Sequence, residues 1–219
     1  MKRRTTFALL TAAAAVLGSV PAVAHADGPG TRTAIVQELI AELPVAAEHR
    51  DGYVRTAFRH WIDADKDGCN TRQEVLKQEA VEPPTQEANC KLVGGEWFSY
   101  YDDAEIDGSS GLDIDHMVPL AEAWDSGAYD WTAQRRQAYA NDLGWSRSLV
   151  AVSARTNRQK ADQDPSDWTP PAADAKCHYL ADWVSVKTRW GLSVDPAEHQ
   201  ALTELAAGCQ EETLDVPIA

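Results

Sequence analysis

The apolar positions of the chain follow two periods, one typical of helices and one typical of strands. Apolar residues recur at helical spacing in several segments, which predicts amphipathic helices. Pro44 and Pro165 stop two of these helices, and Ser153 and Asp195 are suited to cap two of them at the first turn. The predicted helices cover residues 33–43, 53–62, 72–79, 131–141, 154–162, 177–190 and 195–208, and the predicted strands cover 97–101, 112–118 and 148–153.

The predicted strand at 112–118 carries polar residues where its apolar neighbours indicate burial. Asp115 and His116 interrupt an apolar run that Pro119 closes. Buried carboxylates and imidazoles cost free energy unless they are paired or bound to a metal. Asn157, on the helix after the next strand, could supply a second hard oxygen ligand of the kind that magnesium and manganese prefer. A histidine beside such a metal can deprotonate a water molecule. The pattern therefore predicts metal-dependent phosphodiester hydrolysis.

Several motifs together resemble a known family. The chain contains DIDHMVPL at 113–120, an NRxK helix at 157–160 and DQDPSDWTP at 162–170. With these motifs the chain resembles the HNH endonucleases, in the subgroup of secreted actinobacterial proteins with the pattern DHxVPL…NRxK…WxP. The resemblance spans most of residues 53–170. It implies an α+β fold in which a ββα-metal (HNH) finger is embedded in a mainly helical single domain.

The resemblance also implies roles for individual residues. His116 becomes the general base, and Asp115 and Asn157 become the ligands of the catalytic Mg²⁺ or Mn²⁺. Lys160 lies one turn after Asn157 and would hold a substrate phosphate, with Arg158 doing so less directly. The implied activity is endonucleolytic cleavage of DNA, with RNA as an alternative substrate, without sequence specificity, since no base-reading module is recognisable.

One position departs from the family pattern. The family usually has an asparagine just before the second strand, whose side chain braces the loop that carries the base. Ser148 occupies that place here. Asn141 could supply the brace instead, or Ser148 could form a weaker one.

A second metal motif precedes the first. Residues 63–74, DADKDGCNTRQE, match the calcium-loop pattern D-x-D-x-D-G-x₅-E. A calcium ion would be bound by four side chains there, and helical patterns flank the loop on both sides. The alternatives are a solvated acidic loop, or a place near the active site from which Arg72 binds a phosphate. The four predicted calcium ligands are Asp63, Asp65, Asp67 and Glu74.

The first residues and the cysteines predict export. Residues 1–26 carry three cations, an apolar stretch and an A-x-A cleavage site, which predicts a signal peptide and a secreted protein. No later run is apolar enough to span a membrane. Four cysteines in an exported chain favour two disulfides, and three connectivities are open. Pairing within short loops favours Cys69–Cys90 and Cys177–Cys209.

The mature chain, residues 27–219, is predicted to be one domain and a monomer. Its parts are a helical N-terminal region (32–80), the HNH core (95–170) and a helical tail (175–208). The net charge of the whole chain is −14, and removal of Lys2, Arg3 and Arg4 with the signal peptide makes it more negative still. Residues 134–161 nevertheless form a basic island. This island is either a solvated helical face or part of a nucleic-acid footprint.

Three functions are consistent with the sequence. The first is the secreted endonuclease. The second is a non-catalytic calcium-binding interaction module that uses residues 63–74. The third is a secreted metal-dependent hydrolase of another phosphodiester. Cleavage of plasmid DNA with magnesium separates the first from the second.

Overall fold

The structure is a computed structural model that describes residues 30–219. Helices and short antiparallel strand pairs alternate along the chain, so the predicted α+β class is confirmed. The predicted signal peptide lies outside the described residues. The strands are β1 (Thr31–Ile35), β2 (Thr85–Glu87), β3 (Lys91–Val93), β4 (Glu96–Ser99), β5 (Ala104–Asp107), β6 (Leu112–His116), β7 (Leu149–Ser153) and β8 (Thr213–Pro217), and the helices are α1 (Val36–Glu42), α2 (Thr71–Glu79), α3 (Leu120–Asp125), α4 (Ala133–Ala140), α5 (Ala154–Lys160), α6 (Ala175–Trp190) and α7 (Pro196–Ala206).

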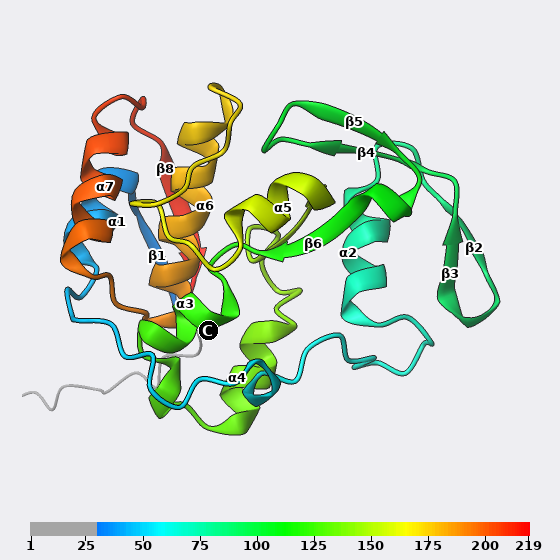
Figure 1. Cartoon of the computed structure of the whole chain (residues 1–219), viewed down its shortest axis with the longest axis horizontal. Coiled ribbons are helices and arrows are strands. Elements are labelled where there is room, and N and C mark those ends of the chain that lie inside the picture. Colours follow the sequence, from blue (N-terminus) through cyan, green and yellow to red (C-terminus); the bar gives the residue numbers. More distant parts are fainter. Residues whose placement is uncertain (1–29) are drawn as a thin grey trace, which may run out of the picture.

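The larger hydrophobic core lies on the side of the molecule formed by α1, α6 and α7 (Figure 1). Trp183 of α6, Leu39 of α1 and Leu202 of α7 are completely buried there. The antiparallel pair β1–β8 also lies on this side. It joins strands that are far apart in the sequence, with Thr31 paired to Pro217. As predicted, the Asp195 side chain caps α7, accepting hydrogen bonds from two backbone amides of the first turn.

The opposite side of the molecule consists of α2 and the hairpins β2–β3 and β4–β5 (Figure 1). A smaller core joins it to the middle strands, with Trp97 and Leu76 almost completely buried. The indole of Trp97 donates a hydrogen bond to the carbonyl of Leu76, so its polar atom is satisfied inside the core.

The antiparallel pair β6–β7, whose strands are joined through α3 and α4, and helix α5 lie between these two sides (Figure 1). The two strands pair in antiparallel register from Leu112↔Ser153 to His116↔Leu149. Helix α5 follows β7 without an intervening loop, and the Ser153 side chain caps it by accepting from the amide of Thr156. The order of this unit is therefore strand, strand, helix, with α5 packed on both strands.

One predicted helix is present but starts later than predicted, and another is wrong. The helix predicted at 33–43 is α1, which starts only at Val36 because residues 31–35 form strand β1. The segment 53–62 contains a single 3₁₀ turn, Arg55–Ala57. Phe58 of this segment is nevertheless buried against Tyr139, whereas Val54 is exposed. Trp61 has φ +56°, a left-handed conformation that a helix does not allow.

Both predicted disulfides are confirmed. Cys69 is bonded to Cys90 and ties the start of α2 to the β2–β3 hairpin. Cys177 is bonded to Cys209 and ties α6 to the segment after α7. The division into one mature domain with three parts and the monomeric state stay predictions. Within residues 30–219, no helix is long and apolar enough to cross a bilayer.

Candidate active site

Asp115 and His116, which are neighbours in the sequence, line one cleft with the distant Asn157. Asp115 and His116 are the last residues of β6, and Asn157 lies on the second turn of α5. The cleft has a volume of about 420 Å³. Its lining residues are Tyr53, Arg55, Ile114, Asp115, His116, Pro119, Leu120, Ala121, Asn157, Arg158, Ala161 and Asp162.

The imidazole of His116 is held in one orientation. Its Nε2 lies 3.0 Å from the carbonyl oxygen of Ala140, which can only accept a hydrogen bond. The proton therefore sits on Nε2, and Nδ1 keeps a free lone pair. The indole ring of Trp61 packs at 5.4 Å from the imidazole, centroid to centroid. Burial lowers the pKa of His116 to about 3, so the ring is neutral at physiological pH.

Asp115 presents its two oxygens to different surroundings. Oδ2 accepts from the hydroxyl of Tyr101 at 2.6 Å and from Nζ of Lys160 at 2.5 Å. Oδ1 has no hydrogen-bond partner among residues 30–219. Burial raises the pKa of Asp115, and the Lys160 ammonium opposes this shift. The carboxylate is thus charge-compensated from the core side while one oxygen stays available to the cleft.

The donor set of the cleft fits a hard divalent cation. The Asn157 side chain is half-buried and forms no hydrogen bond within the part of the chain that the structure describes. Together with Oδ1 of Asp115 it offers two oxygen ligands, with water molecules needed for the remaining positions. Magnesium is usually bound in this way, by one or two protein oxygens and several waters.

The prediction for Lys160 is wrong. Its ammonium is completely buried and cannot reach a phosphate in the cleft. Instead it donates to the carboxylate of Asp115 and to the backbone carbonyls of His116 and Met117, at 3.1 and 2.8 Å. Lys160 therefore stabilises, from the protein interior, the end of β6 that carries the candidate site.

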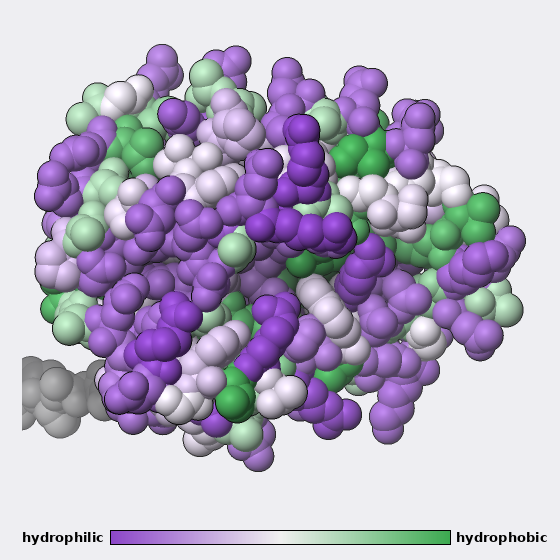
Figure 2. All heavy atoms as spheres, in the orientation of Figure 1, coloured by the Kyte–Doolittle hydropathy of each residue, from purple (hydrophilic) through white to green (hydrophobic). Residues whose placement is uncertain are grey.

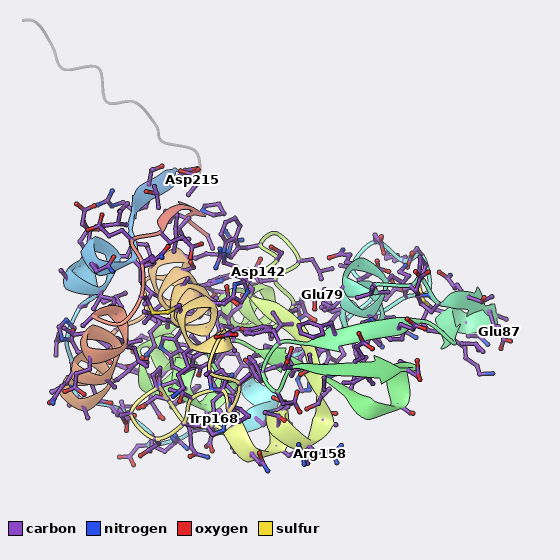
Figure 3. The ribbon with its side chains drawn as sticks, turned by 90° about the horizontal axis from the view of Figure 1, so that it is seen from above. Glu79, Glu87, Asp142, Arg158, Trp168 and Asp215 are labelled. Carbon is purple, nitrogen blue, oxygen red and sulfur yellow. A yellow bond between two sulfur atoms is a disulfide. The ribbon has the colours of Figure 1, made fainter. Side chains whose placement is uncertain are left out.

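The two predicted arginines differ in position. Arg158 lies on the cleft, is largely exposed, and projects from the outer side of α5 (Figure 3). Its Nε is 3.3 Å from a carboxylate oxygen of Asp113. Arg72 does not line the cleft, and its guanidinium donates to the carbonyl of Leu112 at 3.0 Å. The predicted phosphate contact of Arg72 is therefore wrong, because the side chain ties α2 to the beginning of β6.

Comparison with known proteins identifies the family. Residues 71–205, more than half of the chain, match the model of the family described as GmrSD restriction endonucleases, C-terminal domain. The chain belongs to this family. An Arthroderma benhamiae protein named "Uncharacterized secreted protein" is 39% identical over 206 residues, which are 94% of this chain and 98% of that protein. No solved structure matches the chain. Membership in a nuclease family makes nucleic acid the expected class of substrate.

Asn141 of this GmrSD-family chain holds the segment that packs on His116. Its Oδ1 accepts from the backbone amide of Ile62 and from the hydroxyl of Thr71, at 3.1 and 2.7 Å. Its Nδ2 donates to the carbonyl of Arg59 at 2.8 Å. Asn141 follows directly on Ala140, whose carbonyl orients the imidazole. One short stretch thus fixes both the ring and the segment against it.

Ser148 forms a different contact. Its hydroxyl donates to Asp142 at 2.7 Å, and its carbonyl accepts from the amide of Met117. Asp142, which lies in the interior beside α6 in Figure 3, also binds the guanidinium of Arg189. Ser148 therefore links the residue after His116 to α6, whereas Asn141 links the segment 59–62 to α4.

The acidic loop at 63–74 has the predicted exit helix but not the predicted entry helix. Carboxylate oxygens of Asp63, Asp65 and Asp67 lie within 4.8 Å of one another, and all three residues are exposed. Glu74, on α2, is bound at 2.7 Å by the ammonium of Lys77. Since the segment before the loop is not helical, the expected helix-loop-helix is wrong.

The basic island at 134–161 of this GmrSD-family chain is mostly used inside the protein. Arg135 stacks over Trp131 and Trp190, and Arg147 pairs with Asp182. Its other cations are Arg136, which donates to three backbone carbonyls, Lys160, and the exposed Arg155 and Arg158 of α5. The exposed surface around α5 belongs to the hydrophilic middle of the face in Figure 2. The island is therefore neither a solvated face nor a continuous footprint.

Two cleft residues escaped the sequence prediction. Tyr53 and Arg55 belong to the irregular segment before α2. The apolar periodicity of that segment predicted a helix and did not indicate that these residues line the same cleft as Asp115. The family match also begins only at residue 71.

Proposed function

We propose that this chain is a secreted, metal-dependent HNH endonuclease that hydrolyses phosphodiester bonds of DNA without sequence specificity, with RNA as the alternative nucleic-acid substrate. The observation that carries the proposal is that Nδ1 of His116 and Oδ1 of Asp115, neither of which has a hydrogen-bond partner within residues 30–219, share one cleft with the side chain of Asn157. Membership in a nuclease family supports it. In this proposal β6, β7 and α5 are the ββα-metal finger.

His116 acts as the general base. A neutral imidazole whose Nε2–H is bound to Ala140 accepts the proton of the attacking water at Nδ1. The hydrogen bond to Ala140 and the packing of Trp61 restrict rotation of the ring, so Nδ1 stays directed into the cleft. The carbonyl of Ala140 also stabilises the imidazolium that forms.

Asp115 and Asn157 would hold Mg²⁺ or Mn²⁺. When bound, such an ion supplies charge neutralisation at the scissile phosphate and at the leaving oxygen. Lys160 favours the ionised form of Asp115 against the effect of burial and orients the carboxylate through Oδ2. Arg158, exposed on the cleft, contacts a substrate phosphate in exchange for its contact with Asp113. Recognition through the backbone alone implies little sequence preference.

Secretion is part of the proposal. The predicted signal peptide at 1–26 and the name of the Arthroderma benhamiae protein, which describes that protein as secreted, support it. The two disulfides fit an oxidising compartment.

Plasmid cleavage with magnesium tests the proposal. We expect activity that excess EDTA abolishes and that magnesium or manganese restores. Asp115→Asn and Asn157→Ala should each lower turnover by orders of magnitude, and His116→Ala by about 100-fold or more. His199→Ala, on α7 away from the cleft, is the matched control and should cleave normally. Full activity in chelator, or wild-type turnover of His116→Ala, would refute the proposal.

One observation favours the rival function. The clustered carboxylates of Asp63, Asp65 and Asp67 are the feature that a calcium-binding interaction module would need. Such a module would be stabilised by calcium and would cleave nothing. The plasmid assay therefore separates the two functions directly.

A further inference from the structure

We propose that Arg55 is a substrate-binding residue whose guanidinium holds a backbone phosphate of the nucleic acid in the cleft. This inference rests on the proposed function and adds to it a residue from outside the family match at 71–205. Arg55 lines the cleft together with Asp115, His116 and Arg158, although it precedes Asp115 by 60 residues and Arg158 by 103.

Arg55 differs from the other basic residues near the cleft in its ion pairing. Lys160 is bound to Asp115, and Arg158 lies 3.3 Å from a carboxylate oxygen of Asp113. Arg50 is bound to Asp125 and is 3.1 Å from Asp162, the other acid of the cleft. Arg55 is exposed and forms no ion pair with any residue that the structure describes. Its charge is therefore available to an anion in the cleft.

The backbone that carries Arg55 is fixed. The amide of Phe58 donates to the carbonyl of Arg55 at 3.1 Å, which closes a 3₁₀ turn. The guanidinium of Arg136 binds the carbonyl of Ala57, and the phenyl ring of Phe58 is buried. The backbone position of Arg55 is thus set before substrate arrives, so only the side chain has to be ordered on binding.

The chemistry of the side chain fits a phosphodiester. A guanidinium offers a planar fork of N–H donors that binds two phosphate oxygens at once. Arg55 and Arg158 come from separate segments on one cleft that also holds Asp115 and His116. A strand lying in this cleft would therefore meet two cations beside the candidate catalytic groups. Because Arg55 binds the phosphate before and during reaction, its loss should raise KM more than it lowers kcat.

Binding in the absence of cleavage tests this role. The background is His116→Ala, and the probe is a fluorescein-labelled DNA duplex of mixed sequence with magnesium, titrated at several salt concentrations. Adding Arg55→Ala should weaken binding about 10-fold and should reduce the slope of log Kd against log salt by about 0.9, the value for one lost phosphate contact. Arg55→Lys should retain the slope.

Arg59→Ala is the matched control. It removes another exposed arginine of the same segment, one that does not line the cleft, so both affinity and slope should stay unchanged. The melting temperature of Arg55→Ala should match that of its parent, because the side chain has no ion pair to lose. Unchanged affinity in Arg55→Ala, or equal weakening in Arg59→Ala, would overturn the role of Arg55 while leaving the nuclease proposal intact. Failure of the His116→Ala parent to bind DNA would instead overturn the proposed function and the role of Arg55 together.

Discussion

The ammonium of Lys160 lies 2.5 Å from Oδ2 of Asp115, and the lysine side chain is completely buried. Two charges inside a protein stabilise it only when they are paired and their other hydrogen bonds are satisfied. Lys160 meets this condition with two further bonds to backbone carbonyls at the end of β6. The pair therefore anchors the strand end on which the candidate metal ligand and base are carried.

This pairing predicts a stability defect in Lys160 variants. Lys160→Met leaves the Asp115 carboxylate without its cation, so the free energy of unfolding should fall by about 3–5 kcal/mol. Urea denaturation measures the change. Lys176→Met, which removes an exposed lysine from α6, should have little effect. A stable Lys160→Met protein with weakened DNA binding would instead support a direct phosphate contact.

Asn141 and Ser148 should differ as braces. Asn141→Ala removes hydrogen bonds to the segment 59–62 and to Thr71, and we expect a loss of about 2–4 kcal/mol of stability. It should also lower turnover, since Trp61 would no longer be held against His116. Ser148→Ala removes one side-chain bond and should cost about 1 kcal/mol. Thermal unfolding and plasmid cleavage measure the two effects. A larger turnover defect in Ser148→Ala than in Asn141→Ala would show that Ser148, and not Asn141, is the main brace.

Glu79 predicts a dependence of stability on pH. Its carboxylate accepts from the amide of Ala151 on β7, and burial raises its pKa from 4.5 to about 7. The folded protein therefore holds this proton more tightly than the unfolded chain does. The resulting stabilisation is complete below about pH 4.5 and is lost as the pH rises through about 7.

The loss amounts to up to about 3 kcal/mol. Glu79→Gln keeps an acceptor for Ala151 and cannot titrate, so its stability should vary less between about pH 5 and pH 8. Urea denaturation of both proteins at these pH values isolates the contribution of this one group. Parallel pH profiles would show that the Glu79 carboxyl does not titrate as its burial requires.

The acidic loop should bind calcium weakly at most. The ammonium of Lys77 lies 2.7 Å from a carboxylate oxygen of Glu74 and 3.8 Å from one of Asp67. Calcium would therefore have to displace this ammonium. With a Kd of about 1 mM, an equal calcium concentration should raise the melting temperature by about 1 °C. Lys77→Ala should enlarge this shift, and Asp63→Ala with Asp65→Ala should abolish it. A shift of many degrees in the wild type would favour a dedicated calcium site.

The sequence determined the features that depend on short stretches of chain. Strands 112–116 and 149–153 and the helix after Ser153 follow from local apolar runs and a side-chain cap, which act over a few residues. The two disulfides join cysteines 21 and 32 residues apart, so short loop closure identified them. Asp115 and His116 could be singled out as site residues from the sequence, because burying polar side chains in an apolar strand costs free energy unless they are paired or bound to a metal.

Only the tertiary structure decided which partner each charged side chain has. Lys160 and Arg158 lie two residues apart on α5, yet one is buried against Asp115 and the other is exposed on the cleft. The direction of each side chain is set by the strands and helices packed on α5, which periodicity does not reveal. The place of Arg55 on the cleft and the pairing of β1 with β8 were also decided by the tertiary structure. Both depend on contacts between segments far apart in the chain, whose free energy appears only when the core is assembled.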